Sequence, residues 1–258
     1  MSGIANPLQR ENVKHAKLEF NDMWLLTDKV LVGDSGLMDG FRDCHCHLLP
    51  GVDDGVGTVD ETLEILRLWE KAGVKEVWLT PHIMEDIPNK PSDLIKRFEE
   101  LKTVYQGAIR MSLAAEHMMD GLFLRRLGAD DVLPFGTDGT RLLVETSYYI
   151  PPMNMEAVID SIKREGYDPL LAHPERYQYM EKSDFRYWKK KGVLLQLNLP
   201  SLVGAYGQDV MRKAEWLLRE NMYDYCGTDT HSLEQVEYFL EGTISKKAVK
   251  KIRRIVEE

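Results

Sequence analysis

Histidines and acids stand at the ends of short apolar segments in this 258-residue chain. Short apolar segments are typical of buried strands, so we expect these polar residues where strands end. Six of the seven histidines and five acids share this placement: His45, His47, Asp53, Asp54, His82, Glu116, His117, Glu145, His173, Asp229 and His231. Imidazole and carboxylate groups together are typical ligands of Zn²⁺, Mn²⁺ and Fe. The pattern therefore favours a metal centre.

The spacing inside two of these motifs supports the same interpretation. In His45-x-His47 and Asp229-x-His231 the two candidate ligands are two residues apart. Side chains alternate between the two faces of a strand, so both ligands of each motif point the same way and can reach one ion. The candidate ligands outnumber those that a single ion takes, and we expect two or three divalent ions.

Glu116 and His117 are adjacent, so only one of them can face such a centre. We expect Glu116 to face it and His117 to point away. A lone histidine at a strand end is more often a satisfied core or surface residue than a ligand. The metal interpretation therefore depends on the convergence of separate strand ends, and His15, the seventh histidine, has no such context.

Apolar segments alternate with amphipathic stretches from residue 41 onward. The expected strands are 41–46, 75–79, 109–115, 141–145, 169–172, 193–197 and 223–226. The expected helices are 59–72, 93–105, 155–165, 184–191, 208–221, 233–240 and 246–256. Thr58 and Glu61 form a capping box that begins the first of these helices, and Gly73 ends it.

Seven β/α units in series predict an α/β fold with a parallel sheet. At this length, closure into a distorted seven-stranded (β/α)7 barrel is the natural arrangement. We expect residues 1–40 to be an N-terminal extension and residues 41–258 to be the barrel. The carboxyl ends of barrel strands share one face, so the candidate ligands would meet in one cup.

Clustered cations attract anions, and a metal centre of this kind can activate water against a phosphoryl group. Arg176 follows His173 by three residues and could hold a phosphate oxygen; as an alternative, it pairs with Glu175 or Glu181 on the surface. Neither Cys44, Cys46 nor Cys226 has an Arg six residues later, so no cysteine-based phosphate loop is present. The sequence favours a metal-dependent phosphoester hydrolase.

The net charge of −9 argues against a nucleic-acid partner and against anionic membranes. No apolar run of membrane-spanning length occurs, so we expect no membrane insertion. Three cysteines without a CxxC pair fit a reducing compartment, and we expect a cytoplasmic protein. The basic stretch 245–254 is expected to be the solvated face of a terminal helix with Val249, Ile252 and Val256 turned inward.

Long motifs carry a resemblance to a known family. They are Asp43-x-His45-x-His47, Leu49-Pro50-Gly51-Val52-Asp53-Asp54-Gly55, Thr80-Pro81-His82, Glu116, Glu145, His173-Pro174-Glu175-Arg176-Tyr177 and Asp229-x-His231. This set resembles the PHP (polymerase and histidinol phosphatase) superfamily over about residues 41–240. Within the superfamily it is similar to the PHP-type protein tyrosine phosphatases of bacterial capsule and exopolysaccharide systems.

The resemblance implies a trinuclear, often manganese-dependent site that hydrolyses phosphotyrosine, typically on the tail of a bacterial tyrosine autokinase. The implied metal ligands are His45, His47, Asp54, His82, Glu116, Glu145, His173, Asp229 and His231. Asp53 would support the ligands, Arg176 would bind phosphate, and Arg176, Asp229 and His231 are the expected catalytic residues. Mn²⁺ is the expected metal, with Fe and Zn²⁺ as alternatives.

Two features depart from the family pattern: about 40 residues precede the first strand, and residues 232–236 contain no Arg, where many members carry one. The aromatic pair Tyr148 and Tyr149 could flank a phenyl ring or pack at the barrel mouth. The functional alternatives are a small-molecule phosphatase, such as one for histidinol phosphate, and a metal-binding regulatory module without turnover. A nuclease is disfavoured by the acidic balance.

Overall fold

A curled parallel sheet forms the centre of the fold in the computed structural model, which describes residues 28–257. Its strands are β2 (Arg42–Cys46), β3 (Glu76–Leu79), β4 (His82–Ile83), β5 (Arg110–Leu113), β6 (Glu116–Met118), β7 (Arg141–Glu145), β8 (Asp168–Leu171), β9 (Leu194–Asn198) and β10 (Tyr225–Gly227). All pairings among these strands are parallel. The predicted α/β class with a parallel sheet is confirmed.

The strands form two hydrogen-bonded groups, in the orders β2-β3-β5 and β10-β9-β8-β7-β6-β4. A parallel bridge between Cys46 and Thr230 connects the first group to the end of the second. The expected second and third strands are each divided, into β3 and β4 and into β5 and β6. Pro81 lies at the first division, where its missing N–H interrupts the ladder. The predicted count of seven continuous strands is therefore not confirmed.

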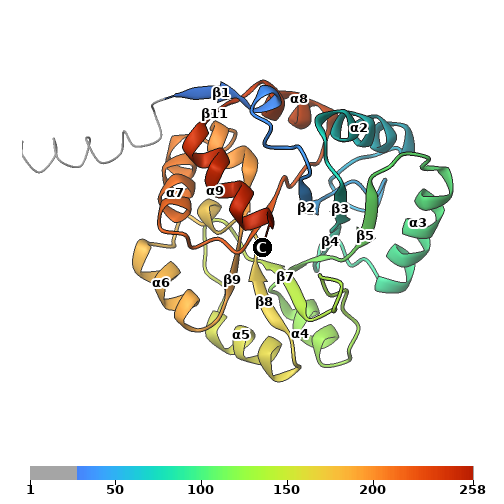
Figure 1. Ribbon diagram of the computed structural model, residues 1–258. Helices are drawn as coiled ribbons and strands as arrows, with labels where there is room; N and C mark the ends of the chain where they lie inside the picture. Colours follow the sequence, from blue (N-terminus) through green and yellow to red (C-terminus); the bar gives the residue numbers. More distant parts are fainter. Residues whose placement is uncertain (1–27, 258) are drawn as a thin grey trace, which may run out of the picture.

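Helices cover the outside of the curled sheet (Figure 1). They are α2 (Val59–Ala72), α3 (Pro91–Val104), α4 (Gly121–Leu127), α5 (Met155–Arg164), α6 (Lys182–Lys190), α7 (Gln208–Arg219), α8 (Leu233–Glu241) and α9 (Lys246–Glu257), with short 3-10 turns η2 (Val32–Asp34), η3 (Pro174–Arg176) and η4 (Leu199–Val203). The expected capping of α2 is confirmed in part: the Thr58 side chain accepts a hydrogen bond from the Glu61 N–H and Gly73 ends the helix at φ 103°, but the Glu61 side chain accepts from the Leu233 N–H and does not complete the capping box. Helix α4 was not expected, and Asp120 caps it.

The segment before β2 packs against the rest of the fold. Strand β1 (Lys29–Leu31) pairs antiparallel with β11 (Thr243–Ser245). Val32, Leu37 and Met38 are buried in the main hydrophobic core. The expected division of the chain at residue 40 stays a prediction, and its earlier part, with His15, lies outside the described residues.

A second, smaller apolar cluster lies on the inner face of the sheet: Cys44, Trp78, Ala114, Phe135, Leu143, Leu170 and Ala172. Leu143 and Glu145 are two residues apart on β7, so their side chains point to the same face. The apolar cluster therefore packs inside the curled sheet, directly below the polar residues at the carboxyl ends of the strands.

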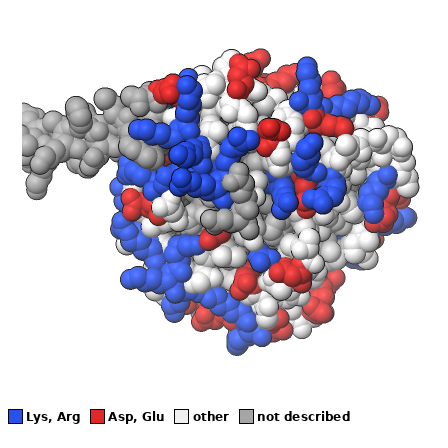
Figure 2. All heavy atoms as spheres, in the orientation of Figure 1, with Lys and Arg blue, Asp and Glu red and all other residues white. Residues whose placement is uncertain are grey.

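Helix α9 packs against β10, away from the carboxyl ends of the strands (Figure 1). Val249 and Ile252 are buried and Val256 is partly buried, which confirms the expected inward face of this helix. Lysine and arginine side chains gather over α9 on the outside (Figure 2). Among residues 28–257 no helix combines the length and the apolar character needed to cross a bilayer.

Candidate metal centre

Two histidines and two acids meet at the centre of the cup. His45 and His47 come from the end of β2, Glu116 begins β6, and Asp229 follows β10. The Nε2 atoms of His45 and His47 are 3.0 Å apart, and each lies 3.2–3.3 Å from Glu116 Oε2 and 3.3 Å from Asp229 Oδ1. All four side chains are buried. They form one candidate cation site.

A second candidate site shares Glu116. His82 Nδ1 lies 3.2 Å from Glu116 Oε2 and 3.1 Å from Glu145 Oε1. His173 Nε2 lies 2.9 Å from Glu116 Oε1 and 3.9 Å from Glu145 Oε2. Glu116 therefore stands between the two sites, where a carboxylate can bridge two ions.

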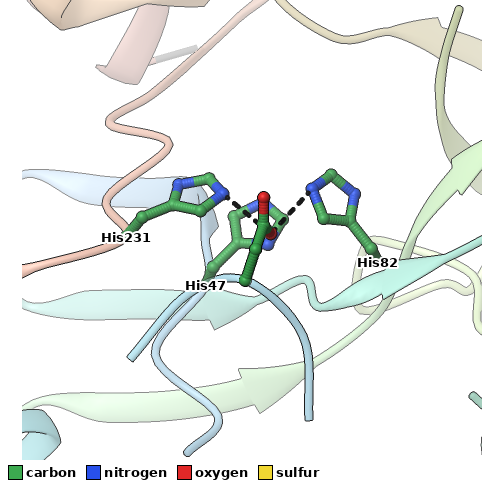
Figure 3. A group of neighbouring side chains, drawn as sticks. His47, His82 and His231 are labelled. Carbon is green, nitrogen blue, oxygen red and sulfur yellow. Dashed lines mark ion pairs between the residues drawn. The ribbon is translucent and has the colours of Figure 1, made fainter. Parts of the chain in front are cut away.

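The third group lies at the mouth of the cup. Asp54 Oδ1 is 3.4 Å from His82 Nε2 and 3.5 Å from His231 Nε2, and His47 belongs to the same group. Figure 3 shows the rings of His47, His82 and His231 turned toward one another, with dashed lines for the ion pairs. The nine residues expected to bind metal thus converge in three adjoining groups.

Unpartnered polar atoms show that these groups fit cations. His82 Nδ1 lies 3.1–3.2 Å from Glu145 Oε1 and Glu116 Oε2, and these three buried atoms make no hydrogen bond of acceptable geometry among residues 28–257. Burying such atoms without partners is costly, because each loses its hydrogen bonds to water. Divalent cations bound between them would satisfy these nitrogens and carboxylate oxygens.

The electrostatics reflect an excess of acid around buried imidazoles. Burial lowers the pKa of His45, but Glu116 and Asp229 outweigh it and raise that pKa to about 9. Burial raises the pKa of Glu116, but His45 and His173 hold it well below its usual value. The hydrogen bond from His231 lowers the pKa of Asp54 to about 2. Asp54 and Glu116 stay ionised, and a bound cation would replace the proton on His45.

Supporting residues hold the candidate ligands in place. Asp53 Oδ2 accepts hydrogen bonds from His47 Nδ1 at 2.8 Å and from the His82 N–H at 2.9 Å. This is the supporting role that the family resemblance implies for Asp53. Gln196 Oε1 lies 3.1 Å from His45 Nδ1, and it also accepts from the His173 N–H. Gln196 was missed, because a glutamine inside an apolar strand carries no signal of its own.

Backbone conformation at two strand ends is strained. His173 and Asp229 have positive φ values of 32° and 51°. Such values are unfavourable for side chains other than glycine, and they persist where surrounding contacts enforce them. The Asp229 N–H is held by a 2.7 Å hydrogen bond to the His45 carbonyl, which keeps its side chain in the cup.

Arg176 lies at the edge of the centre, with its guanidinium between two aromatic rings. The guanidinium carbon is 4.3 Å from the ring centroids of both Tyr148 and Tyr206. Nη1 donates to Asp229 Oδ2 at 2.7 Å, and Asn198 Nδ2 donates to the same oxygen at 3.1 Å. Arg176 therefore pairs with Asp229, and the alternative of a surface pair with Glu175 or Glu181 is wrong.

His117 lies outside the cup, as expected. Its Nδ1 is 3.3 Å from the Leu143 carbonyl, and its Nε2 is 3.4 Å from the Leu133 N. Burial lowers its pKa to about 4. The segment after His231, which lacks the family's Arg, places Gln235 beside the site, and the Gln235 side chain accepts from the His231 N–H at 2.8 Å.

A family model described as "Capsular polysaccharide synthesis, CpsB/CapC" matches residues 41–254. The chain belongs to this family. The predicted resemblance to the phosphatases of capsule systems is confirmed, while membership of the wider PHP superfamily stays a prediction.

Curated members of the CpsB/CapC family are similar to the chain over most of their length. YwqE of Bacillus subtilis, a tyrosine-protein phosphatase, is 25% identical over 74% of this chain and 78% of its own. CpsB of Streptococcus agalactiae, also a tyrosine-protein phosphatase, is 24% identical over 77% of this chain and 86% of its own. The putative tyrosine-protein phosphatase CapC of Staphylococcus aureus is 22% identical over 81% of this chain and 84% of its own.

A solved structure of YwqE from Bacillus subtilis and CpsB from Streptococcus pneumoniae, described as "unique metal-dependent tyrosine phosphatases", has the same fold. It superposes with a TM-score of 0.66 at 22% identity and covers 84% of this chain and 86% of its own. The structural similarity to this solved structure supports the curled parallel α/β fold.

Proposed function

We propose that this member of the CpsB/CapC family is a metal-dependent protein tyrosine phosphatase. The observation that carries the proposal is the convergence of nine histidine and carboxylate side chains from separate strand ends beside Arg176. The relatives named as tyrosine-protein phosphatases support the assignment of the substrate.

The proposed ligands are His45, His47, Asp54, His82, Glu116, Glu145, His173, Asp229 and His231. Three adjoining groups of nitrogen and oxygen donors support two or three divalent ions, and we propose Mn²⁺, which suits mixed imidazole and carboxylate donors. When bound, the ions would activate water and stabilise charge on the phosphoryl oxygens.

Arg176 is the proposed phosphate-binding residue. Its Nη1 is committed to Asp229, which leaves the Nε and Nη2 N–H groups to donate to phosphoryl oxygens. The rings of Tyr148 and Tyr206 keep the guanidinium from swinging away, so the donors are in position before substrate binds. Asp229 links this donor to the metal-binding groups, because its other oxygen faces His45 and His47.

His231 is the third proposed catalytic residue. Its side chain is partly exposed at the mouth, where Nδ1 lies 2.8 Å from the Asp229 carbonyl and Nε2 faces Asp54. The His231 ring therefore lies where a substrate would enter the cup, whereas His45 and His47 are fully buried below it.

The proposed substrate is a phosphotyrosine-bearing protein, the tail of a tyrosine autokinase in capsule or exopolysaccharide regulation. We further propose a cytoplasmic location, which the three free, buried cysteines support. The proposed domain organisation remains an extension before residue 41 and a hydrolase domain after it.

A substrate panel tests the proposed function. The protein is loaded with Mn²⁺, its bound metal is measured, and phosphate release is compared for a phosphotyrosyl peptide, a phosphoseryl peptide, histidinol phosphate and short DNA. We expect preference for the phosphotyrosyl peptide, lost in Asp229→Ala. Turnover of histidinol phosphate alone would indicate the small-molecule phosphatase, and metal binding without turnover would indicate the regulatory module.

A further inference from the structure

An exposed apolar loop, residues 146–154, connects β7 to α5 beside the metal centre. Tyr149, Ile150 and Met153 are 69%, 70% and 96% exposed, the highest values among the large exposed hydrophobic side chains of the described residues. The other large exposed hydrophobic residues are spread over β1, α2, α3, α4, α6 and α8, and none of them is more than 53% exposed. Single exposed apolar residues need no explanation, but a cluster of this kind marks an interaction site.

The sequence of this loop sets it apart from the rest of the surface. Residues 146–154 contain no charged side chain, although 29% of the chain is charged. Pro151 and Pro152 restrict the backbone, so the loop loses little conformational entropy when its side chains are covered. The loop is therefore suited to cover an apolar partner surface.

The base of the loop is continuous with the metal centre. The strand before it ends in Glu145, and the Tyr148 ring packs on Arg176 and lies 5.7 Å from the His173 ring. The Tyr148 carbonyl accepts from the Gln178 N–H at 2.8 Å, which ties the loop to the segment after Arg176. Tyr148 thus faces the site, while the next two residues face outward.

We propose that residues 149–153 form the docking surface for the polypeptide that carries the phosphotyrosine, and that they contact apolar residues next to it. This inference rests on the proposed function. A small phosphomonoester bound at the metal centre ends within the cup, whereas a polypeptide chain continues over the rim. Covering Tyr149, Ile150 and Met153 requires apolar side chains on that chain, because the loop offers no charge to pair with.

The test compares wild-type protein with the triple variant Tyr149→Ser, Ile150→Ser, Met153→Ser. Three substrates are used: phenyl phosphate, a phosphotyrosyl peptide with leucines on both sides of the phosphotyrosine, and the same peptide with serines there. For the leucine peptide we expect KM to rise about tenfold in the variant with kcat unchanged, since apolar area is no longer buried. For the serine peptide and phenyl phosphate we expect equal values in both proteins.

The control is Ile95→Ser with Val104→Ser, which removes two exposed apolar side chains from α3 and should change no kinetic constant. Equal KM values of wild type and triple variant for the leucine peptide would overturn the docking surface. A wild-type dimer that the triple variant dissociates in sedimentation, with peptide KM unchanged, would also overturn it in favour of a second copy. Wild-type protein that cleaves none of the three substrates would overturn the proposed function as well.

Discussion

Arg176 illustrates how single residues set the chemistry of this centre. Its guanidinium is between Tyr148 and Tyr206 and bonded to Asp229, so one side chain connects the aromatic mouth to the buried ligands. Its side chain is 17% exposed, which leaves it accessible to a phosphate that enters the cup. Neighbouring aromatic rings and a carboxylate together hold such a cation more firmly than either could alone.

Removing one ring of this arrangement should weaken phosphate binding. A cation–π contact contributes about 0.5–2 kcal/mol, so we expect Tyr206→Leu to lower kcat/KM about two- to thirtyfold. Tyr206→Phe keeps the ring and should restore most of the activity, although it loses the 3.2 Å hydrogen bond to Asn198. Steady-state kinetics with phenyl phosphate measures both. Equal losses in the two variants would show that the hydroxyl, and not the ring, matters.

Asp53 offers a second test at the same scale. Its carboxylate orients His47 through Nδ1, and supporting residues of this kind typically change metal affinity about 10- to 100-fold. We expect Asp53→Asn to weaken Mn²⁺ binding by that factor while the fold is kept. Calorimetric titration with Mn²⁺ measures the affinity, and an unchanged dissociation constant would contradict the supporting role.

The strands and their connections decide where these residues meet. Strand β2 shifts its register against β3 between Asp43 and Cys46, and such irregularities re-aim side chains. His45 and His47 lie in the cup, while Cys46 between them joins the main core, as the alternation of side chains along a strand requires. On β10, Gly227 allows the backbone to lie directly against His45, because a Cβ there would be 2.6 Å from the His45 Cβ.

Glycine substitutions test this close approach. Gly227→Ala should displace His45 and Gln196, whose Nε2 atom would lie 2.8 Å from the new Cβ. We expect at least a tenfold loss of bound Mn²⁺, together with a lower melting temperature. Gly57→Ala is the matched control, since nothing lies within 4 Å of its new Cβ. Full metal content in Gly227→Ala, measured by mass spectrometry of the metal, would count against the account.

The sequence predicted elements better than it predicted the connections between them. Apolar segments and helix caps located the main strands and helices, because burial and capping leave direct patterns in the chain. The division of the second and third strands was missed, since it depends on how Pro81 and the small residues Ala114 and Ala115 meet neighbouring strands. The candidate ligands could be predicted because their types are rare at strand ends, whereas Tyr206 and Gln196 are ordinary residues placed only by the tertiary fold.

At the scale of the whole molecule, the metal centre and the fold are coupled. Candidate ligands from β2, β4, β6 and β7 and from the segments after β2, β8 and β10 would be joined by bound ions. A ligand present at a hundred times its dissociation constant stabilises the folded state by about 2.7 kcal/mol. We therefore expect saturating Mn²⁺ to raise the melting temperature by about 5–10 °C. Calorimetry with and without chelator checks this, and an identical shift in Asp229→Asn would indicate binding elsewhere.

The acid response of the whole fold should depend on His117. Its pKa is lowered from 6.5 to about 4 because the ring is buried. The unfolded chain binds the proton first as pH falls, so stability is fully present above pH 6.5 and is lost between pH 6.5 and 4. We expect this loss to be smaller in His117→Gln by on the order of 3 kcal/mol. Urea unfolding at a series of pH values measures the difference, and parallel curves would contradict it.

Hydrolysis of phosphotyrosine by this protein should require metal ions held by the converging histidine and carboxylate side chains. The most direct measurement is phosphate release from a phosphotyrosyl peptide by chelator-treated protein during titration with Mn²⁺, with the bound metal determined in the same samples. We expect negligible turnover without metal, a rise in turnover that follows the amount of bound metal, and no rise in Asp229→Asn. Undiminished turnover in protein shown to be free of metal would contradict it.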